Sequence, residues 1–291
     1  MVKKLSQLYL EARRAFSQHE DKQTASLLAR SLLCHITEKT PEMLLADLEM
    51  YGSQSVCDEM ETATSRILAG EPLAYVLGEW DFYGMTLQVN KNVLIPRDDT
   101  CAVTELAIKQ ARLFDGTSRI LDLCTGSGCI GLAIANKVTS PRITLADISQ
   151  EAMAVAKKNI SRQKLSGRVA CVCADALQKP PAFLGKFDMI VSNPPYITTE
   201  EMALLPDSVK NFEPHLALHG GDDGLKFYRS IAENYAEALK PGGYLCFEFG
   251  MGQGDAVCHI LEMNGYTILE RSRDYNDRER AVIAQYGRKE D

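Results

Sequence analysis

The feature that most limits the fold of this 291-residue chain is a regular alternation of apolar runs and helical stretches after residue 118. Five apolar runs have the length and composition of buried strands, and they cover 119–123, 142–147, 168–173, 187–192 and 244–250. Helical periodicity marks stretches before and between them, namely 98–113, 151–165 and 225–239. This βαβ alternation predicts an α/β fold with a doubly wound, mostly parallel sheet that helices cover on both faces. Two further runs, 266–271 and 280–286, would add an antiparallel pair at one edge and complete a seven-stranded sheet.

The chain before this region predicts a separate helical domain. Apolar residues recur at helical spacing from Leu5 to about Ala69. From Trp80 to Pro96 their spacing drops toward two, which is typical of a β-hairpin. We therefore expect a small all-helical domain of about four helices at 1–75, a linker with a β-hairpin at 76–97 and the sheet domain at 98–291.

The composition limits which cellular compartment and which kinds of partner we expect for this protein. A net charge of −7 lacks the basic footprint that is typical of nucleic-acid-binding proteins. Nine cysteines are scattered without a C-x-x-C pair, which predicts reduced thiols and no structural metal. No run is long and apolar enough to span a membrane, and the first residues carry no signal-peptide core. We therefore expect a cytoplasmic protein that binds neither nucleic acid nor a membrane.

A glycine-rich loop, DLCTGSGCIG, directly follows the first predicted strand. Gly126 and Gly128 would let the backbone approach a ligand closely. Asp147 ends the next strand 21 residues after Gly126, where a carboxylate can accept hydrogen bonds from ribose hydroxyls. The glycines alone fit NAD and S-adenosylmethionine equally well, and a tight turn without a ligand is a third interpretation. Two carboxylates favour S-adenosylmethionine, because Asp122 could hold the ammonium group of its methionine moiety and Asp175 could line an adenine pocket.

The fourth predicted strand ends in the sequence SNPPYI, on the same rim of the sheet as the glycine loop. The simple interpretation is a loop, because Asn-Pro and Pro-Pro break strands. The side-chain oxygen of Asn193 and the carbonyl of Pro194 could also accept hydrogen bonds from both N–H groups of a planar NH2 group, since neither Pro194 nor Pro195 offers a backbone donor. Tyr196 could stack on that group. Two such acceptors would align a poorly nucleophilic nitrogen with a methyl donor, so that no strong base is required.

NPPY together with such a loop resembles the amino-methyltransferases that act on planar NH2 groups of glutamine, adenine or cytosine. Longer motifs resemble the successive signatures of the bacterial peptide-chain release factor glutamine methyltransferases: GEPLAYVLGEWDFYG (70–84), VLIPRDDT (93–100), NFEPHLALHGGDDGLKFY (211–228), LKPGGYLCFEFG (239–250) and RDYNDRERAV (273–282). The resemblance implies a Rossmann-like class I methyltransferase. Its substrate would be the side-chain amide of the glutamine in the Gly-Gly-Gln motif of release factors, and S-adenosyl-L-homocysteine would be the product.

The resemblance also implies roles for individual residues. The cofactor contacts would come from Cys124, Thr125, Gly126, Ser127, Gly128, Asp147, Asp175, Ala176 and Asn193, in addition to Asp122. The glutamine amide would be held by Asn193, Pro194, Pro195 and Tyr196, and the helical domain with its hairpin would recognise the release factor. Cys124 stands where the family usually has Gly, and Cys101 where it usually has Glu. For Arg97 an ion pair and a substrate contact are both open.

Other functions share part of this pattern. A sister glutamine methyltransferase that modifies a ribosomal protein requires the same local chemistry. A DNA or RNA adenine N6-methyltransferase could use the same two acceptors, but it would need a basic region to bind phosphates, and the acidic composition argues against one. A non-catalytic binding module with the same fold and an NAD-linked oxidoreductase are the remaining alternatives.

Overall fold

The computed structural model describes residues 2–287, which divide into two compact units. One unit runs up to Gly78 and includes Asp207–Phe212. The other comprises Glu79–Pro206 and the chain from Glu213 onward. Within residues 2–287, no helix has the length and apolar character that a membrane crossing requires.

The first unit is helical and has its own core. Its helices are α1 (Leu5–Phe16), α2 (Lys22–Thr37), α3 (Pro41–Ala46), α4 (Gln54–Leu68), α5 (Leu73–Leu77) and α10 (Asp207–Lys210). Side chains cap three of the helix starts: Asp21 accepts from the backbone N–H groups at the start of α2, Thr40 does so for α3 and Ser53 for α4. Phe16, Leu32 and Leu33 are buried among the helices, so the helical periodicity of the sequence corresponds to a packed face.

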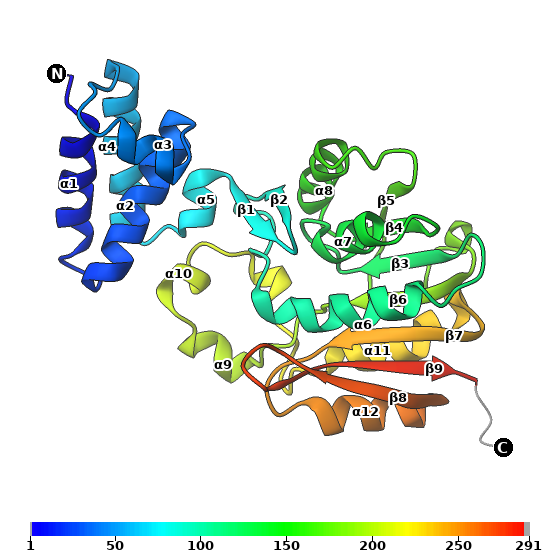
Figure 1. Ribbon diagram of the computed structural model, residues 1–291. Coiled ribbons are helices and arrows are strands. Elements are labelled where there is room, and N and C mark those ends of the chain that lie inside the picture. The colour runs from blue at the N-terminus through cyan, green and yellow to red at the C-terminus, as the bar shows by residue number, and fades with distance from the viewer. Residues whose placement is uncertain (1, 288–291) are drawn as a thin grey trace. The chain divides into compact units, whose positions relative to one another are not determined.

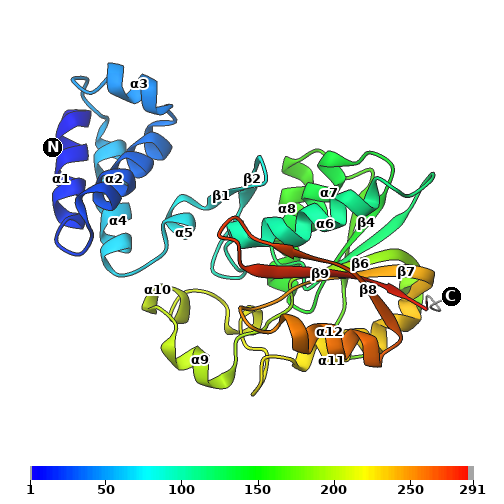
Figure 2. The same ribbon diagram turned by 60° about the horizontal axis from the view of Figure 1, so that its bottom comes forward.

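The second unit contains a seven-stranded sheet, and Figures 1 and 2 show it from two sides. Its strands are β3 (Arg119–Leu123), β4 (Arg142–Asp147), β5 (Val169–Cys173), β6 (Phe187–Ser192), β7 (Leu239–Glu248), β8 (Tyr266–Arg273) and β9 (Glu279–Tyr286). Their spatial order is β5-β4-β3-β6-β7-β9-β8. The first five pair in parallel, whereas β9 pairs antiparallel with both β7 and β8. The predicted α/β fold with a mostly parallel, seven-stranded sheet is confirmed.

Helices cover both faces of this sheet (Figure 2). The helices α6 (Cys101–Ala111), α7 (Cys129–Lys137) and α8 (Gln150–Arg162) pack on one face, and α11 (Lys226–Asn234) and α12 (Gly254–Met263) pack on the other. Neighbouring strand residues alternate between the faces. Ile120 packs with the first group and Leu121 with the second. Both faces are therefore dry, which explains why the strands are apolar throughout.

The β-hairpin is shorter than the sequence predicts. It consists of β1 (Glu79–Phe82) and β2 (Met85–Gln88). The chain then turns at Asn90, whose side chain and carbonyl accept from the N–H groups of Asn92 and Val93. Val93 is buried beyond this turn without belonging to a strand. The hairpin itself is present, with its turn at Tyr83 and Gly84, and an Asx-type turn at Asn90 ends the ladder before the apolar residues resume.

Candidate active site

A cleft opens at the carboxyl ends of the parallel strands. Its walls come from the segment before α6, the glycine loop after β3, the ends of β4 and β5, the loop after β6 and a stretch before α11. The residues that line the cleft include Arg97, Thr100, Cys124, Thr125, Gly126, Ser127, Asp147, Asp175, Ala176, Asn193, Pro195 and Pro214. This is the rim at which open α/β sheets bind their ligands.

The glycine loop follows β3 and is held by backbone hydrogen bonds. The N–H of Thr125 donates to the carbonyl of Ala146 on β4 at 3.0 Å. Gly126 has φ +54°, and a Cβ atom there would meet nothing within 4 Å. At Gly131 a Cβ atom would lie 2.3 Å from Leu145, so that glycine allows α7 to pack against the sheet. The loop thus presents backbone toward open space, as a site for a bound cofactor requires.

Asp122 lies behind this loop and not on the cleft wall. Its side chain is fully buried, and Oδ2 accepts hydrogen bonds from the Thr125 hydroxyl at 2.6 Å and the Gly131 N–H at 2.8 Å. Burial raises the pKa of the Asp122 carboxyl to about 7, although these two hydrogen bonds lower it. The role of Asp122 as an ammonium ligand stays a prediction; in the structure its Oδ2 atom fixes the glycine loop through these two hydrogen bonds, and Oδ1 has no hydrogen-bond partner among residues 2–287. Gly128 likewise lies off the wall, with φ +87° at the start of α7.

Asp147 and the chain after β5 form the next part of the wall. The Asp147 Oδ2 atom accepts from the Gly126 N–H at 2.9 Å, and Oδ1 accepts from the Ser149 N–H at 3.0 Å. Each oxygen keeps capacity for a further donor, so the carboxylate can hold vicinal hydroxyls. Burial raises its pKa. Asp175 and Ala176 lie on the same wall.

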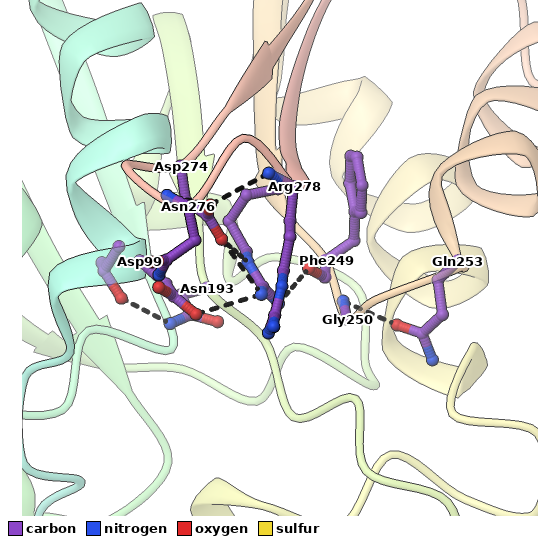
Figure 3. Close-up of polar contacts among 10 residues, drawn as sticks. Asp99, Asn193, Phe249, Gly250, Gln253, Asp274, Asn276 and Arg278 are labelled. Atoms are coloured by element: carbon purple, nitrogen blue, oxygen red, sulfur yellow. Dashed lines mark hydrogen bonds and ion pairs between the residues drawn. The ribbon is translucent and has the colours of Figure 1, made fainter.

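Asn193 ends β6, and its side-chain orientation is set by two other segments. Its Nδ2 atom donates to the hydroxyl of Thr100 at 3.3 Å, and Thr100 belongs to the short 3-10 helix Asp98–Thr100 before α6. The Asn193 side chain also lies close enough to the buried carboxyl of Glu248, the last residue of β7, to lower the pKa of that carboxyl. Because the NH2 group donates to Thr100, the side-chain oxygen remains available as an acceptor. Figure 3 shows Asn193 beside Asp99, the residue that precedes Thr100.

Glu248 and Thr100 are site residues that sequence reasoning missed. The carboxyl of Glu248 is buried, and no group among residues 2–287 hydrogen-bonds to its Oε2 atom. Burial raises the pKa of Glu248 to about 8, against hydrogen bonds from Thr100 and Asn193 and the charge of Arg280. The available signal was an acidic residue at the end of an apolar run, in CFEFG, since such a residue reaches the ligand rim of a parallel sheet.

The backbone of the NPPY loop is packed against a glycine-rich segment. The N–H of Ile197 donates to the carbonyl of Leu218 at 2.9 Å, and the N–H of Gly220 returns a bond to Ile197 at 2.8 Å. A Cβ atom at Gly220 would lie 2.7 Å from the Pro195 carbonyl oxygen, and one at Gly224 would lie 2.3 Å from that of Tyr196. The HGGDDG sequence is therefore required for close approach to NPPY. Pro195 lines the cleft, whereas Pro194 and Tyr196 lie off its wall.

Arg97 makes an ion pair with Glu213, whose carboxylate is buried. The other Glu213 oxygen accepts from the Ile95 N–H at 3.2 Å. Arg97 and Pro214 both line the cleft, so this pair joins two segments of the cleft wall. Of the two roles left open for Arg97, the structure displays the ion pair.

Two cysteines occupy positions where the resembling family has other residues. Cys124 has φ +59°, a left-handed conformation that favours glycine, and burial raises the pKa of its thiol. Cys101 is the buried first residue of α6, where burial raises the thiol pKa to about 11. Both thiols are therefore protonated at neutral pH.

The comparisons with known proteins agree with this geometry. The chain matches the methyltransferase small domain over residues 104–220 and the PrmC N-terminal domain over residues 7–78. A release factor glutamine methyltransferase of Clostridium acetobutylicum is 40% identical over 216 residues, covering 74% of this chain and 75% of that protein. One from Vibrio cholerae is 36% identical over 269 residues and covers 92% of each. The catalytic domain of hMettl16, solved in complex with the MAT2A 3'UTR hairpin 6, has a similar fold, with a TM-score of 0.56 and 14% identity over 83% of this chain and 86% of that one.

The sheet, the cleft at its carboxyl rim and the matched domain define the chain as a methyltransferase. By its similarity over most of its length to curated relatives, it belongs to the family of release factor glutamine methyltransferases. The resemblance drawn from its motifs is confirmed.

Proposed function

We propose that this chain methylates the side-chain amide nitrogen of the glutamine in the Gly-Gly-Gln motif of peptide-chain release factors and thereby modulates translation termination. S-adenosyl-L-methionine would be the methyl donor and S-adenosyl-L-homocysteine the product. Family membership supports this substrate, since the relatives are named for it. The observation that carries the chemistry is the Asn193 side chain, which directs its NH2 group into the protein and keeps its oxygen for a substrate donor.

The cleft fits the proposed cofactor. The open space beside Gly126 and the two partly used oxygens of Asp147 suit a ligand that brings an apolar chain and ribose hydroxyls. The segment 124–127 would contact the methionine part, Asp147 the ribose, and Asp175 with Ala176 the adenine. Asp122 and Gly128 would contribute indirectly, by fixing the conformation of the glycine loop. When bound, S-adenosylmethionine supplies an electrophilic methyl group.

The residues of the NPPY loop would promote the reaction by orienting the glutamine amide. Asn193 through its side-chain oxygen and Pro194 through its carbonyl would accept both hydrogens of the glutamine NH2 group. These hydrogen bonds strengthen as positive charge develops on the nitrogen, so they favour the transition state over the ground state. Tyr196 would pack beside the flat amide. A strong base is not needed, since the nitrogen becomes acidic once it is methylated.

The helical domain at 1–75 and the hairpin region at 76–97 would recognise the surface of the release factor, and residues 98–291 would carry the reaction. The match of residues 7–78 to a domain that is separate from the methyltransferase domain supports this division of labour. Because release factors act on ribosomes, we place the reaction in the cytoplasm.

Transfer of a labelled methyl group tests the proposal. The protein is incubated with labelled S-adenosylmethionine and a release factor, beside a copy in which the glutamine of Gly-Gly-Gln is changed to alanine. We expect label in the first and none in the second. Equal labelling of the two would contradict the substrate. Label in added ribosomal protein or DNA would favour one of the alternatives with the same NH2 chemistry.

A further inference from the structure

The C-terminal motif RDYNDRERAV has no part in the chemistry derived so far. It forms the turn between β8 and β9, at the outer end of the sheet. Within it, Arg280 is a buried cation, with a relative exposure of 6%. A buried guanidinium is costly unless each of its donors is satisfied, so its partners indicate what it holds in place.

The first partner of Arg280, which lies in β9, is Asp274 in the turn before that strand. Its Oδ2 atom accepts from Nε and Nη2 of Arg280, each at 3.3 Å. Its Oδ1 atom accepts from the N–H groups of Asn276 at 2.8 Å and Arg278 at 3.1 Å (Figure 3). Asp274 thus fixes both the turn and the guanidinium. Through Asp274, the turn holds the Arg280 side chain in one position.

Arg280 also contacts two segments that lie beside Asn193. Its Nη2 atom forms an ion pair with Asp99 at 3.0 Å. Its Nη1 atom donates to the carbonyl of Phe249 at 3.3 Å, and its own carbonyl accepts from the Phe249 N–H at 2.9 Å. Asp99 and Phe249 lie far apart in the sequence, so the guanidinium cross-links the chain before α6 to the chain after β7.

The residues adjacent to these two contacts lie beside Asn193. Thr100 follows Asp99 and accepts a hydrogen bond from Asn193 Nδ2 at 3.3 Å. Glu248 precedes Phe249, and its buried carboxyl lies close enough to Thr100 and Asn193 for both side chains to lower its pKa. Arg280 therefore touches the immediate neighbours of Thr100, which binds the Asn193 amide, and of Glu248, which lies next to it.

We propose that Arg280 is a positioning residue for methyl transfer: by joining Asp99 to Phe249 it keeps Thr100 and Glu248 together, so that the Asn193 oxygen faces the substrate. This inference rests on the proposed function of Asn193 as the amide acceptor. A small displacement of a group that orients a substrate lowers the rate strongly while binding elsewhere in the site persists.

The test compares Arg280→Gln with the matched control Arg273→Gln. Arg273 lies in the same turn region but is exposed and pairs with Asp277. For each full-length variant, kcat and KM are measured with the release factor, and the Kd for S-adenosylmethionine is measured by calorimetry. We expect kcat to fall roughly 10- to 100-fold in Arg280→Gln, with KM and the cofactor Kd nearly unchanged. Arg273→Gln should match the wild type. A kcat for Arg280→Gln within twofold of the control would overturn the inference.

Two further variants separate positioning from folding. Asp99→Asn removes one arm of the cross-link but leaves Asp274 and Phe249 on Arg280. Asp99→Asn should also lower kcat. If Arg280→Gln fails to fold, a kcat of Asp99→Asn equal to that of the wild type would by itself overturn the inference. The double variant Thr100→Val with Arg280→Gln should be no slower than the slower single variant, because both act through Asn193. If the losses in kcat of the two single variants added up in the double variant, the two residues would not both act through Asn193.

A readout without turnover separates this inference from the proposed function. In the NMR spectrum of labelled protein, the side-chain NH2 signals of Asn193, assigned by their loss in Asn193→Ala, should shift in Arg280→Gln and Asp99→Asn but not in Arg273→Gln. Unmoved signals would overturn the inference even if the wild type methylates release factors. Shifted signals in a protein that never methylates release factors would uphold the positioning role and contradict the substrate instead.

Discussion

The amide nitrogen of Asn193 donates to the hydroxyl of Thr100 at 3.3 Å, although 93 residues separate the two in the sequence. This contact decides which end of the Asn193 side chain faces the cleft. With the NH2 group held by Thr100, the side-chain oxygen is the polar atom left to accept from a substrate. An acceptor suits an amide NH2 group, which offers two donors, and it cannot serve a carboxylate or carbonyl substrate.

Asn193→Ala should abolish transfer and retain much of the cofactor affinity. Removal of one oriented group that stabilises a transition state costs roughly 100- to 1000-fold in kcat, whereas the glycine loop and Asp147 remain to bind the cofactor. Single-turnover rates and calorimetric Kd values measure the two effects. Asn264→Ala, which removes a side-chain bond to Ile260 on α12, is the control. Unchanged turnover in Asn193→Ala would remove Asn193 from the mechanism.

Asp147→Asn should weaken cofactor binding without stopping the reaction at saturation. Hydrogen bonds to a charged acceptor contribute about 1.5–3 kcal/mol, so the Kd for S-adenosylmethionine should rise roughly 10-fold or more. Equilibrium binding by calorimetry measures this change. Asp188→Asn serves as the control, since Asp188 lies at the opposite end of the sheet and pairs with Lys240. A Kd equal to that of the wild type would exclude Asp147 from the cofactor site.

Cys124 can be exchanged for glycine but not for a branched residue. Its φ of +59° costs an L-residue about 1–2 kcal/mol, and glycine removes that strain but adds unfolded-state entropy of similar size. Cys124→Gly should therefore leave the free energy of unfolding nearly unchanged and bind the cofactor at least as well. Cys124→Val should lose roughly 1–3 kcal/mol. Urea unfolding and calorimetry test both variants, and equal stability of the two would show that the backbone conformation is not constrained.

Glu248 makes stability depend on pH. Burial raises the pKa of its carboxyl from 4.5 to about 8, so the folded protein binds this proton more tightly than the unfolded chain does. Its contribution is therefore fully present below about pH 4.5 and is lost as the pH rises toward 8, by about 5 kcal/mol at most. Unfolding of the wild type and Glu248→Gln at pH 6 and pH 9 should show a smaller pH-dependent loss in the variant. The exposed Glu233→Gln should behave like the wild type, and identical profiles for all three would refute the shift.

Local patterns in the sequence predict most of the fold. Strand-like runs such as 119–123 and 187–192 match β3 and β6 at both ends, because buried parallel strands must be apolar throughout. The hairpin ends at Gln88 although the same apolar alternation continues past a turn: Val93 is buried but does not belong to a strand. Alternation reports which side chains are buried, and hydrogen-bond pairing is a separate requirement.

The site residues also fall into those that the sequence could predict and those that it could not. Gly126, Asp147 and Asn193 lie near predicted strand ends, and parallel topology places such ends on one rim, so the sequence could assemble them. Thr100, Glu248 and Arg280 come from three other elements that meet around Asn193, and no local spacing in the sequence encodes that meeting. Asp122 shows the converse, since its place beside the loop suggested a ligand while its side chain points into the packed interior.

Mass spectrometry of the release factor peptide that contains Gly-Gly-Gln tests the proposed chemistry most directly. The release factor is incubated with S-adenosylmethionine and either wild-type protein or Asn193→Ala, then digested and fragmented to locate the added methyl group. We predict one methyl group on the side-chain amide of that glutamine after reaction with the wild type, and almost none with Asn193→Ala in the time that the wild type needs to complete the reaction. A methyl group on another residue, or the same modification from the variant, would contradict the assignment of Asn193 as the acceptor that orients the glutamine amide.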